Sequence, residues 1–207
     1  MEAPLTILYT ANLRGELGFA PRLFTMLKGM KGQAAQAGSA ALLLDLGGSA
    51  DMQVWHNAVT GGRSSLFALD AMGYDAANAT HLHPQNIAKM QPSCRMALLG
   101  EGQSRRLKGA RLFVPPQPDG NPATLNIVLI PSDATAFDPD ARVLMLQNIA
   151  LGQVGAAQIT FGPKGAALGS SAVYDVPATT PPDPTVTGAI EFILSEADYV
   201  MRKAQGR

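Results

Sequence analysis

The sequence predicts one α/β domain over residues 1–207, a layered sandwich with parallel strands in its N-terminal half, antiparallel strands in its C-terminal half and a closing helix. Two observations lead to this prediction. Short apolar runs alternate with helix-like segments over residues 5–90, which is typical of a parallel sheet with helical connections. After residue 150, two apolar runs are joined by a short turn rich in glycine and proline, which is typical of a hairpin.

The first strand and helix are predicted from the opening residues. The run Leu5–Thr10 is short, apolar and rich in β-branched residues, so we expect a buried strand that ends at the polar loop 11–15. Pro21 suits the first turn of a helix, and the glycine-containing segment 32–38 is expected to end it. The apolar face of this helix would comprise Leu23, Phe24, Leu27 and Met30.

The same strand-to-helix order then repeats. Residues 40–45 (AALLLD) predict a central parallel strand, residues 63–72 a helix stopped by Gly73, and residues 74–79 a third strand. Because the carboxyl ends of parallel strands meet at one edge of a sheet, the loops after these strands should lie together there. We expect a ligand at this edge, among Asn12, Arg14, Gly47, Gly48, His81 and His83.

The remainder of the chain is less regular. We expect a short helix from Pro84 to Met90, apolar runs at 95–99, 110–114 and 125–130, and a surface loop at 115–122. Periodicity alone leaves 143–149 as strand or helix. Residues 154–161 and 166–176 predict an antiparallel hairpin.

The closing helix is predicted from its cap and its apolar face. Asp183 followed by Pro184 is a plausible N-cap with proline at the first helical position. Its buried face would carry Ile190, Ile193, Ala197 and Val200.

Charge and composition exclude several classes of partner. Sixteen basic and sixteen acidic residues cancel, so nothing in the overall charge favours nucleic acid or an anionic membrane surface. No apolar run reaches the roughly 20 residues of a membrane helix. Since no signal peptide is visible, we expect a cytoplasmic protein, with a trimmed exported protein as the alternative. The single cysteine, Cys94, cannot form an internal disulfide and is expected to be a half-buried apolar residue.

Several stretches together resemble the calcineurin-like metallophosphoesterases, within them the 5'-nucleotidase and UDP-sugar hydrolase branch. Residues 7–17 (ILYTANLRGEL) are similar to that branch's first strand and T-N-D-x-H-G loop, and residues 41–51 (ALLLDLGGSAD) to its D-x-G-D strand. Residues 69–84 (LDAMGYDAANATHLHP) resemble its G-Y-D-A strand leading to G-N-H-E. The strands from residue 154 and the helix at 183–193 resemble the end of its catalytic domain, so the likeness covers roughly 5–90 and 143–200.

The resemblance implies a two-metal hydrolase, yet most ligand positions carry other residues. The first-loop aspartate and histidine fall on Asn12 and Arg14, and the bridging aspartate falls on Gly48. An amide is a poor charge partner for a cation, a guanidinium cannot be a ligand, and glycine has no side chain to offer. Asp45 matches an aspartate that is not a ligand. The G-N-H-E asparagine and histidine fall on Thr80 and His81 or, without a skipped residue, on His81 and Leu82; the family's later histidines have no counterpart.

Three functions follow as hypotheses. The leading one is a non-hydrolytic phosphoesterase-like domain, without a cofactor, that binds a protein partner or a small anion at the former active-site edge. The second is a phosphoester hydrolase with one zinc or manganese ion at His81, His83 and Asp45 or Asp51. The third is a structural subunit that packs against itself or a neighbour.

Individual polar residues also have two interpretations each. Arg14 could hold a phosphate or carboxylate with help from the backbone N–H groups of Gly47 and Gly48, or it could lie in solvent or pair with Glu16. His81 and His83 could be a loop pair that binds no metal. We expect His56, beside Trp55, to serve packing or lie at the surface, and we expect Arg105, Arg106 and Lys108 to form a solvated basic cluster.

Overall fold

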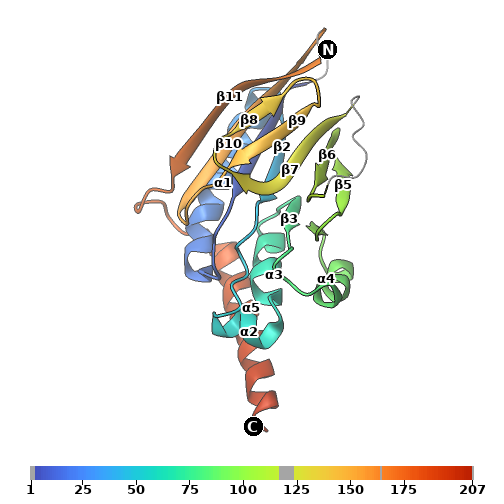
Figure 1. The fold of residues 1–207 in the computed structure, drawn as a ribbon. Helices are drawn as coiled ribbons and strands as arrows, with labels where there is room; N and C mark the ends of the chain where they lie inside the picture. Colours follow the sequence, from blue (N-terminus) through green and yellow to red (C-terminus); the bar gives the residue numbers. More distant parts are fainter. Residues whose placement is uncertain (1–2, 117–123, 164, 207) are drawn as a thin grey trace.

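A computed structural model describes residues 3–116, 124–163 and 165–206 of the chain. Two β-sheets pack face to face, and helices cover the outer face of the larger sheet (Figure 1). The predicted α/β class is therefore right, and both sheets are mixed.

The larger sheet contains the strands predicted for the N-terminal half together with the C-terminal hairpin. Its order is β11-β10-β1-β2-β3-β4, with β1 to β4 parallel and β10 antiparallel to both β1 and β11. The weakly patterned middle of the chain thus adds a strand, β4, to this sheet. The strands are β1 Leu5–Thr10, β2 Ala40–Asp45, β3 Ala76–Asn78, β4 Ala97–Leu99, β10 Gln153–Gly162 and β11 Gly165–Asp175.

The smaller sheet corrects the expectation of a purely antiparallel C-terminal half. Its order is β5-β6-β7-β9-β8, and β6, β7 and β9 are parallel neighbours. The strands are β5 Ser104–Leu107, β6 Ala110–Phe113, β7 Leu125–Ser132, β8 Ala136–Asp138 and β9 Val143–Gln147.

Segment 143–149, which periodicity left open, contains strand β9. Leu144 and Leu146 are fully buried while Met145 and Gln147 are exposed, the alternation of a strand with one buried face. The short strands β5 and β8 and the helix α2 were not expected. Most of the predicted surface loop 115–122 lies outside the described residues.

The helices follow the predicted order with one correction. α1 continues through Gly32 to Gln36, because Gly29 and Gly32 lie on its open side and Ala34 is buried beyond them. It ends before Gly38, whose φ is +70°. The helices are α1 Ala20–Gln36, α2 Trp55–Thr60, α3 Arg63–Ala71, α4 Pro84–Met90 and α5 Pro184–Ala204, with 3₁₀ turns at Leu17–Phe19 and Gln91–Ser93. No helix of the described chain is long and apolar enough to span a membrane.

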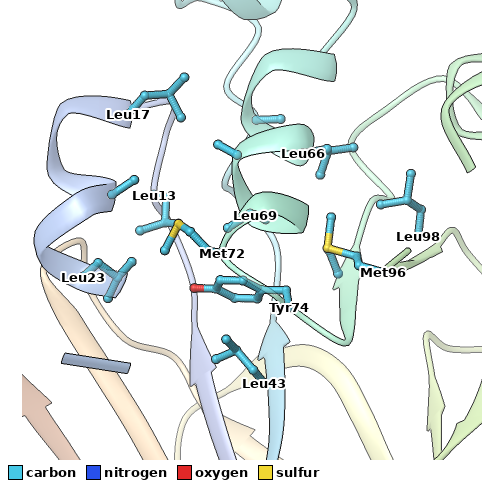
Figure 2. Close-up of a cluster of buried hydrophobic side chains, with 14 of the residues drawn as sticks. Leu13, Leu17, Leu23, Leu43, Leu66, Leu69, Met72, Tyr74, Met96 and Leu98 are labelled. Carbon is cyan, nitrogen blue, oxygen red and sulfur yellow. The ribbon is translucent and has the colours of Figure 1, made fainter. Parts of the chain in front are cut away.

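Alternation along the central strands produces two cores. Leu8 of β1 and Leu43 of β2 face the helices and belong to one buried cluster. Figure 2 shows Leu43 in this cluster with Leu23 of α1 and with Leu66 and Leu69 of α3. On the opposite face of the same strands, Ile7, Tyr9, Leu42 and Leu44 pack against the smaller sheet. Burying each leucine stabilises the fold by about 1.5–3 kcal/mol. Both faces of β1 and β2 are therefore fixed, which holds the loops that follow these strands.

Candidate functional site

The loops after β1 and β2 are joined to each other by backbone hydrogen bonds. The N–H of Asn12 donates to the carbonyl of Gly47 at 2.9 Å, that of Arg14 to Gly48 at 3.0 Å, and that of Gly15 to Ser49 at 2.8 Å. The bonds continue the β1–β2 ladder past the strand ends. The structure thus brings Asn12, Arg14, Gly47 and Gly48 together.

This ladder uses an uncommon backbone conformation. Asn12 and Arg14 have φ values of 56° and 50°, and Gly15, Gly47 and Gly48 have φ values of 77°, 108° and 73°. A positive φ costs a residue with a Cβ roughly 1–2 kcal/mol. Such local strain concentrates where a loop serves a site. Of the non-glycine residues with a positive φ in the described chain, Asn12 and Arg14 lie together at this edge, and Lys108 and Arg142 lie elsewhere.

Asn12 closes the space beside Gly48. A Cβ atom on Gly48 would lie 2.8 Å from Asn12 Oδ1 and 3.3 Å from Asn12 Cα. The Asn12 Nδ2 group donates to Asn148 Oδ1 at 2.9 Å and to the Ile149 carbonyl at 2.8 Å. Asn12 thus connects the β1 loop to the chain between β9 and β10, and its own atoms fill the room that a side chain at position 48 would need.

Asp45 lies below the loop. It is fully buried and accepts hydrogen bonds from the Ser49 hydroxyl at 2.6 Å, the Gly47 N–H at 3.2 Å and the Thr10 hydroxyl at 3.4 Å. Burial raises the pKa of Asp45 to about 7, against the lowering effect of these donors. The Thr10 hydroxyl also shares a 2.8 Å bond with the Tyr74 hydroxyl. Asp45 therefore organises the turn after β2 from inside, and it takes the Gly47 N–H away from any external anion.

Arg14 and Gly48 form the exposed part of the edge. Both are exposed, and within the described ranges neither the Arg14 side chain nor the Gly48 N–H has a hydrogen-bond partner in the protein. The possible ion pair with Glu16 is not formed. One cation and one backbone donor therefore face solvent on neighbouring loops.

The two loop histidines have different environments. His83 is the N-cap of α4, where its Nδ1 accepts a 3.3 Å hydrogen bond from the Gln85 N–H. Partial burial lowers the pKa of His81, while the carboxylate of nearby Asp51 opposes that shift. Among the residues that the structure describes, no group of three or more His, Cys, Asp or Glu side chains is placed to hold a metal ion. With an amide at 12, a guanidinium at 14 and no side chain at 48, the donor set does not fit a two-cation centre.

His56 supports the first loop from below. It is buried in α2, and its Nε2 lies 3.0 Å from the Gly15 carbonyl, so this nitrogen carries the proton. Trp55, which is 45% exposed, packs edge-on against the His56 ring. The predicted packing role of His56 agrees with this arrangement.

Asn78 is a residue of this edge that the sequence interpretation did not single out. Its Nδ2 donates to the carbonyls of Leu46 at 3.1 Å and Leu129 at 2.6 Å, and its Oδ1 accepts from the Thr80 N–H and hydroxyl. It therefore joins the loop after β2 to the smaller sheet. The signal was available, because a lone amide within the apolar run AANA must find partners once buried.

The remaining polar candidates lie away from this edge. Arg105 and Arg106 are exposed on β5, as expected of a solvated cluster, whereas Lys108 is bound to Asp75 at 2.8 Å. Cys94 is half-buried, as expected.

No protein-family model and no curated protein sequence matches this chain. Solved structures do match it. The sulfate thiohydrolase SoxB of Thermus thermophilus superposes with a TM-score of 0.63 at 11% identity, over 95% of this chain and 61% of that one. The calcineurin-like phosphoesterase YfkN of Bacillus subtilis gives 0.59 at 11% identity, over 97% of this chain and 100% of that one.

The 5'-nucleotidase of Candida albicans gives a TM-score of 0.57 at 10% identity, over 95% of this chain and 58% of that one. The chain thus spans about three fifths of the length of SoxB and of this nucleotidase. These superpositions establish the fold, and at identities this low they leave the activity open. By structure, the chain has the fold of the calcineurin-like phosphoesterases, SoxB and the 5'-nucleotidases.

Proposed function

We propose that this protein is a non-hydrolytic domain with a phosphoesterase fold that binds a small anion at the edge formed by the loops after β1 and β2. The observation that carries the proposal is the contact between Asn12 and Gly48. The Asn12 side chain is bonded to Asn148 and Ile149 and fills the space beside Gly48. The site is thus built around an amide where the resemblance implies metal ligands.

Two-metal hydrolysis needs a bridging donor and several carboxylate or imidazole ligands around both ions. At the corresponding positions this chain offers an amide committed to two acceptors and a glycine with φ +73°. Asp45 is buried and accepts hydrogen bonds from two donors of its own turn, Gly47 and Ser49, and from Thr10 of β1. These residues support a role in binding rather than in generating a metal-bound nucleophile.

The anion would meet Arg14 and the N–H of Gly48. An exposed guanidinium presents five donors in a planar fork, which suits carboxylate and phosphate oxygens. The backbone N–H of Gly48 adds a neutral donor on the neighbouring loop. A free anion or an acidic group of a protein partner would be recognised by the same chemistry.

A hydrolysis assay tests the first part of the proposal. The purified protein is incubated with p-nitrophenyl phosphate, bis(p-nitrophenyl) phosphate or AMP, with added manganese, zinc or cobalt. We expect no turnover that a chelator abolishes. Chelator-sensitive turnover that returns on adding metal, together with stoichiometric metal in the purified protein, would overturn the proposal in favour of a rebuilt site at His81 and His83.

Anion binding tests the second part. Binding of inorganic phosphate or sulfate to the folded state raises the unfolding temperature, by an amount that grows with the logarithm of ligand concentration over Kd. We expect R14Q to weaken this binding about tenfold, since one charge-assisted interaction contributes roughly 1.5 kcal/mol or more. R22Q, on the exposed side of α1, is the matched control and should bind as the wild type does. Equal affinities of R14Q and R22Q would contradict the role of Arg14.

A further inference from the structure

A second candidate site lies between the helices, on surfaces that the Arg14 edge does not share. A cavity of about 370 Å³ opens between α2, α3, α4 and the C-terminal half of α5. We propose that this cavity binds an organic anion with an apolar body of about the size of an aromatic ring system. The residues that line the cavity include Val59, Arg63, Phe67, Lys89, Met90 and Val200.

Two cations line the cavity without a counter-ion. Arg63, in the first turn of α3, and Lys89, in the last turn of α4, both face it. Neither makes a hydrogen bond or ion pair with any part of the chain that the structure describes. Two like charges on one concave surface raise the local concentration of counter-ions, which favours an anionic occupant.

The Arg63 guanidinium is held in place before any ligand arrives. It lies 5.6 Å from the centre of the Phe67 ring, one helical turn further along α3. A cation–π contact of this kind favours a position of the guanidinium near the ring, and its N–H groups have no acceptor in the described chain. Less side-chain entropy is lost on binding, which favours affinity in a small site.

The rest of the lining combines the polar side chains of Thr60, Asn86 and Ser93 with apolar side chains that suit a ligand body. Val59 of α2, Phe67 of α3, Met90 of α4 and Val200 of α5 are buried or partly buried around the cavity. A second hollow of about 90 Å³ shares Thr60, Arg63 and Phe67 with the first and continues along α5. Phe192, which is 68% exposed, Ile193 and Glu196 line that continuation, and the Glu196 carboxylate forms no ion pair with Arg63. An apolar group attached to the anion would remove these apolar side chains from water.

Size and composition define the ligand class. A volume of about 370 Å³ falls within the usual range of small-molecule sites, which combine a mostly apolar lining with a few polar groups. Arg63 and Lys89 would bind a carboxylate or a phosphate monoester, and the ring-bearing part would contact Phe67 and Val200. An inorganic anion would satisfy the cations but leave the apolar lining uncovered.

The single tryptophan provides a direct reporter. Trp55 lies one helical turn before Val59 on α2, so it is close to the cavity. Dansylglycine carries a carboxylate on an aromatic body and accepts excitation energy from tryptophan. Dansylamide has the same body without the carboxylate. We expect saturable quenching of Trp55 by dansylglycine, at least tenfold tighter than by dansylamide.

Charge variants locate the binding. R63Q and K89Q should each weaken dansylglycine binding about tenfold, while dansylamide binding stays within twofold. The matched controls R22Q and K31Q, both on α1, remove the same charges elsewhere and should bind as the wild type does. Circular dichroism and the unfolding temperature show whether each variant is folded, and K89Q remains informative if R63Q is not, because Lys89 is exposed.

Competition identifies the anionic group. Benzoate and phenyl phosphate are each titrated against bound dansylglycine, and displacement by one of them names the headgroup, carboxylate or phosphate. Failure of both to displace it, absence of saturable quenching, or equal affinity of K89Q and K31Q would overturn the proposal. R14Q should leave dansylglycine binding unchanged, so failure here and failure at the Arg14 edge are distinguishable.

Discussion

Asn12 and Gly48 lie in contact across the loops that follow β1 and β2, where a Cβ atom on Gly48 would come within 2.8 Å of Asn12 Oδ1. Because Asn12 is also bonded to Asn148 and Ile149, the contact cannot relax without breaking the link to the β9–β10 connection. Position 48 must therefore be a glycine as long as Asn12 keeps these hydrogen bonds.

The G48A variant tests this contact. We expect it to lower the free energy of unfolding by about 2–4 kcal/mol, because the methyl group adds a clash with Asn12 to the strain of φ +73°. Urea denaturation followed by circular dichroism measures the change.

The matched control is G73A. Gly73 has φ +74°, but nothing lies within 4 Å of the position a Cβ would take. G73A should lower the free energy of unfolding by only about 1 kcal/mol, because it adds backbone strain without a clash. Equal losses of unfolding free energy in G48A and G73A would show that the Asn12 contact is not tight and that packing does not require a glycine at position 48.

Asp45 predicts a pH dependence of stability. Its pKa is raised to about 7 in the folded protein, whereas an unfolded aspartate titrates near pH 3.9, a value of roughly that size in model peptides. The folded state therefore binds the proton more tightly. The stabilisation is complete below the unfolded pKa and is lost as the pH rises through about 7, with a slope of at most about 1.4 kcal/mol per pH unit.

The D45N variant removes the titrating carboxyl group. Its unfolding free energy should therefore fall less between pH 4 and 7 than that of the wild type. The other carboxyl groups titrate in both proteins and cancel in the difference. S49A removes the 2.6 Å donor to the carboxylate, which should raise the pKa of Asp45 further and move the fall to higher pH. Identical pH profiles for the wild type and D45N would show that Asp45 is already ionised in the folded protein.

Gly155 is the position where β10 passes under Tyr9. A Cβ atom there would lie 2.0 Å from Tyr9 Cζ, and Tyr9 is 1% exposed, so the ring has no free direction to move. G155A should lower the free energy of unfolding by about 3 kcal/mol or more. G162A, in the same strand with nothing within 4 Å, should change it by less than about 0.5 kcal/mol. Comparable denaturation midpoints for the two variants would refute the tight packing of Tyr9 on Gly155.

Asp183 caps α5 by accepting hydrogen bonds from the N–H groups of Thr185 at 2.9 Å and Val186 at 3.2 Å. D183A should cost about 1 kcal/mol of stability, measured by thermal unfolding with urea titration as a check. D198A, which removes the ion pair with Arg202 on the same helix, should cost no more than about 0.5 kcal/mol. A loss of stability in D183A no larger than that in D198A would contradict the capping role of Asp183.

The sequence by itself determined the elements whose pattern is local. Residues 40–45 form β2 with the predicted bounds, and Asp183 and Pro184 start α5 as expected. The resemblance to phosphoesterases also rested on short sequence motifs, and the superposed structures agree with it in fold. Short-range periodicity and capping are written in consecutive residues, which is why they can be read without a fold.

Only the tertiary structure decided which strands are neighbours in the smaller sheet and what closes the edge. The parallel pairing of β6, β7 and β9 depends on where the chain returns, which no local pattern encodes. The bonds from Asn12 to Asn148 and from Asn78 to Leu129 join residues 136 and 51 positions apart. In the sequence, Asn12 is a missing aspartate. In the fold, its side chain fills the space beside Gly48 and donates hydrogen bonds to Asn148 and Ile149. A buried polar group must find partners, and only the tertiary structure shows which partners Asn12 has.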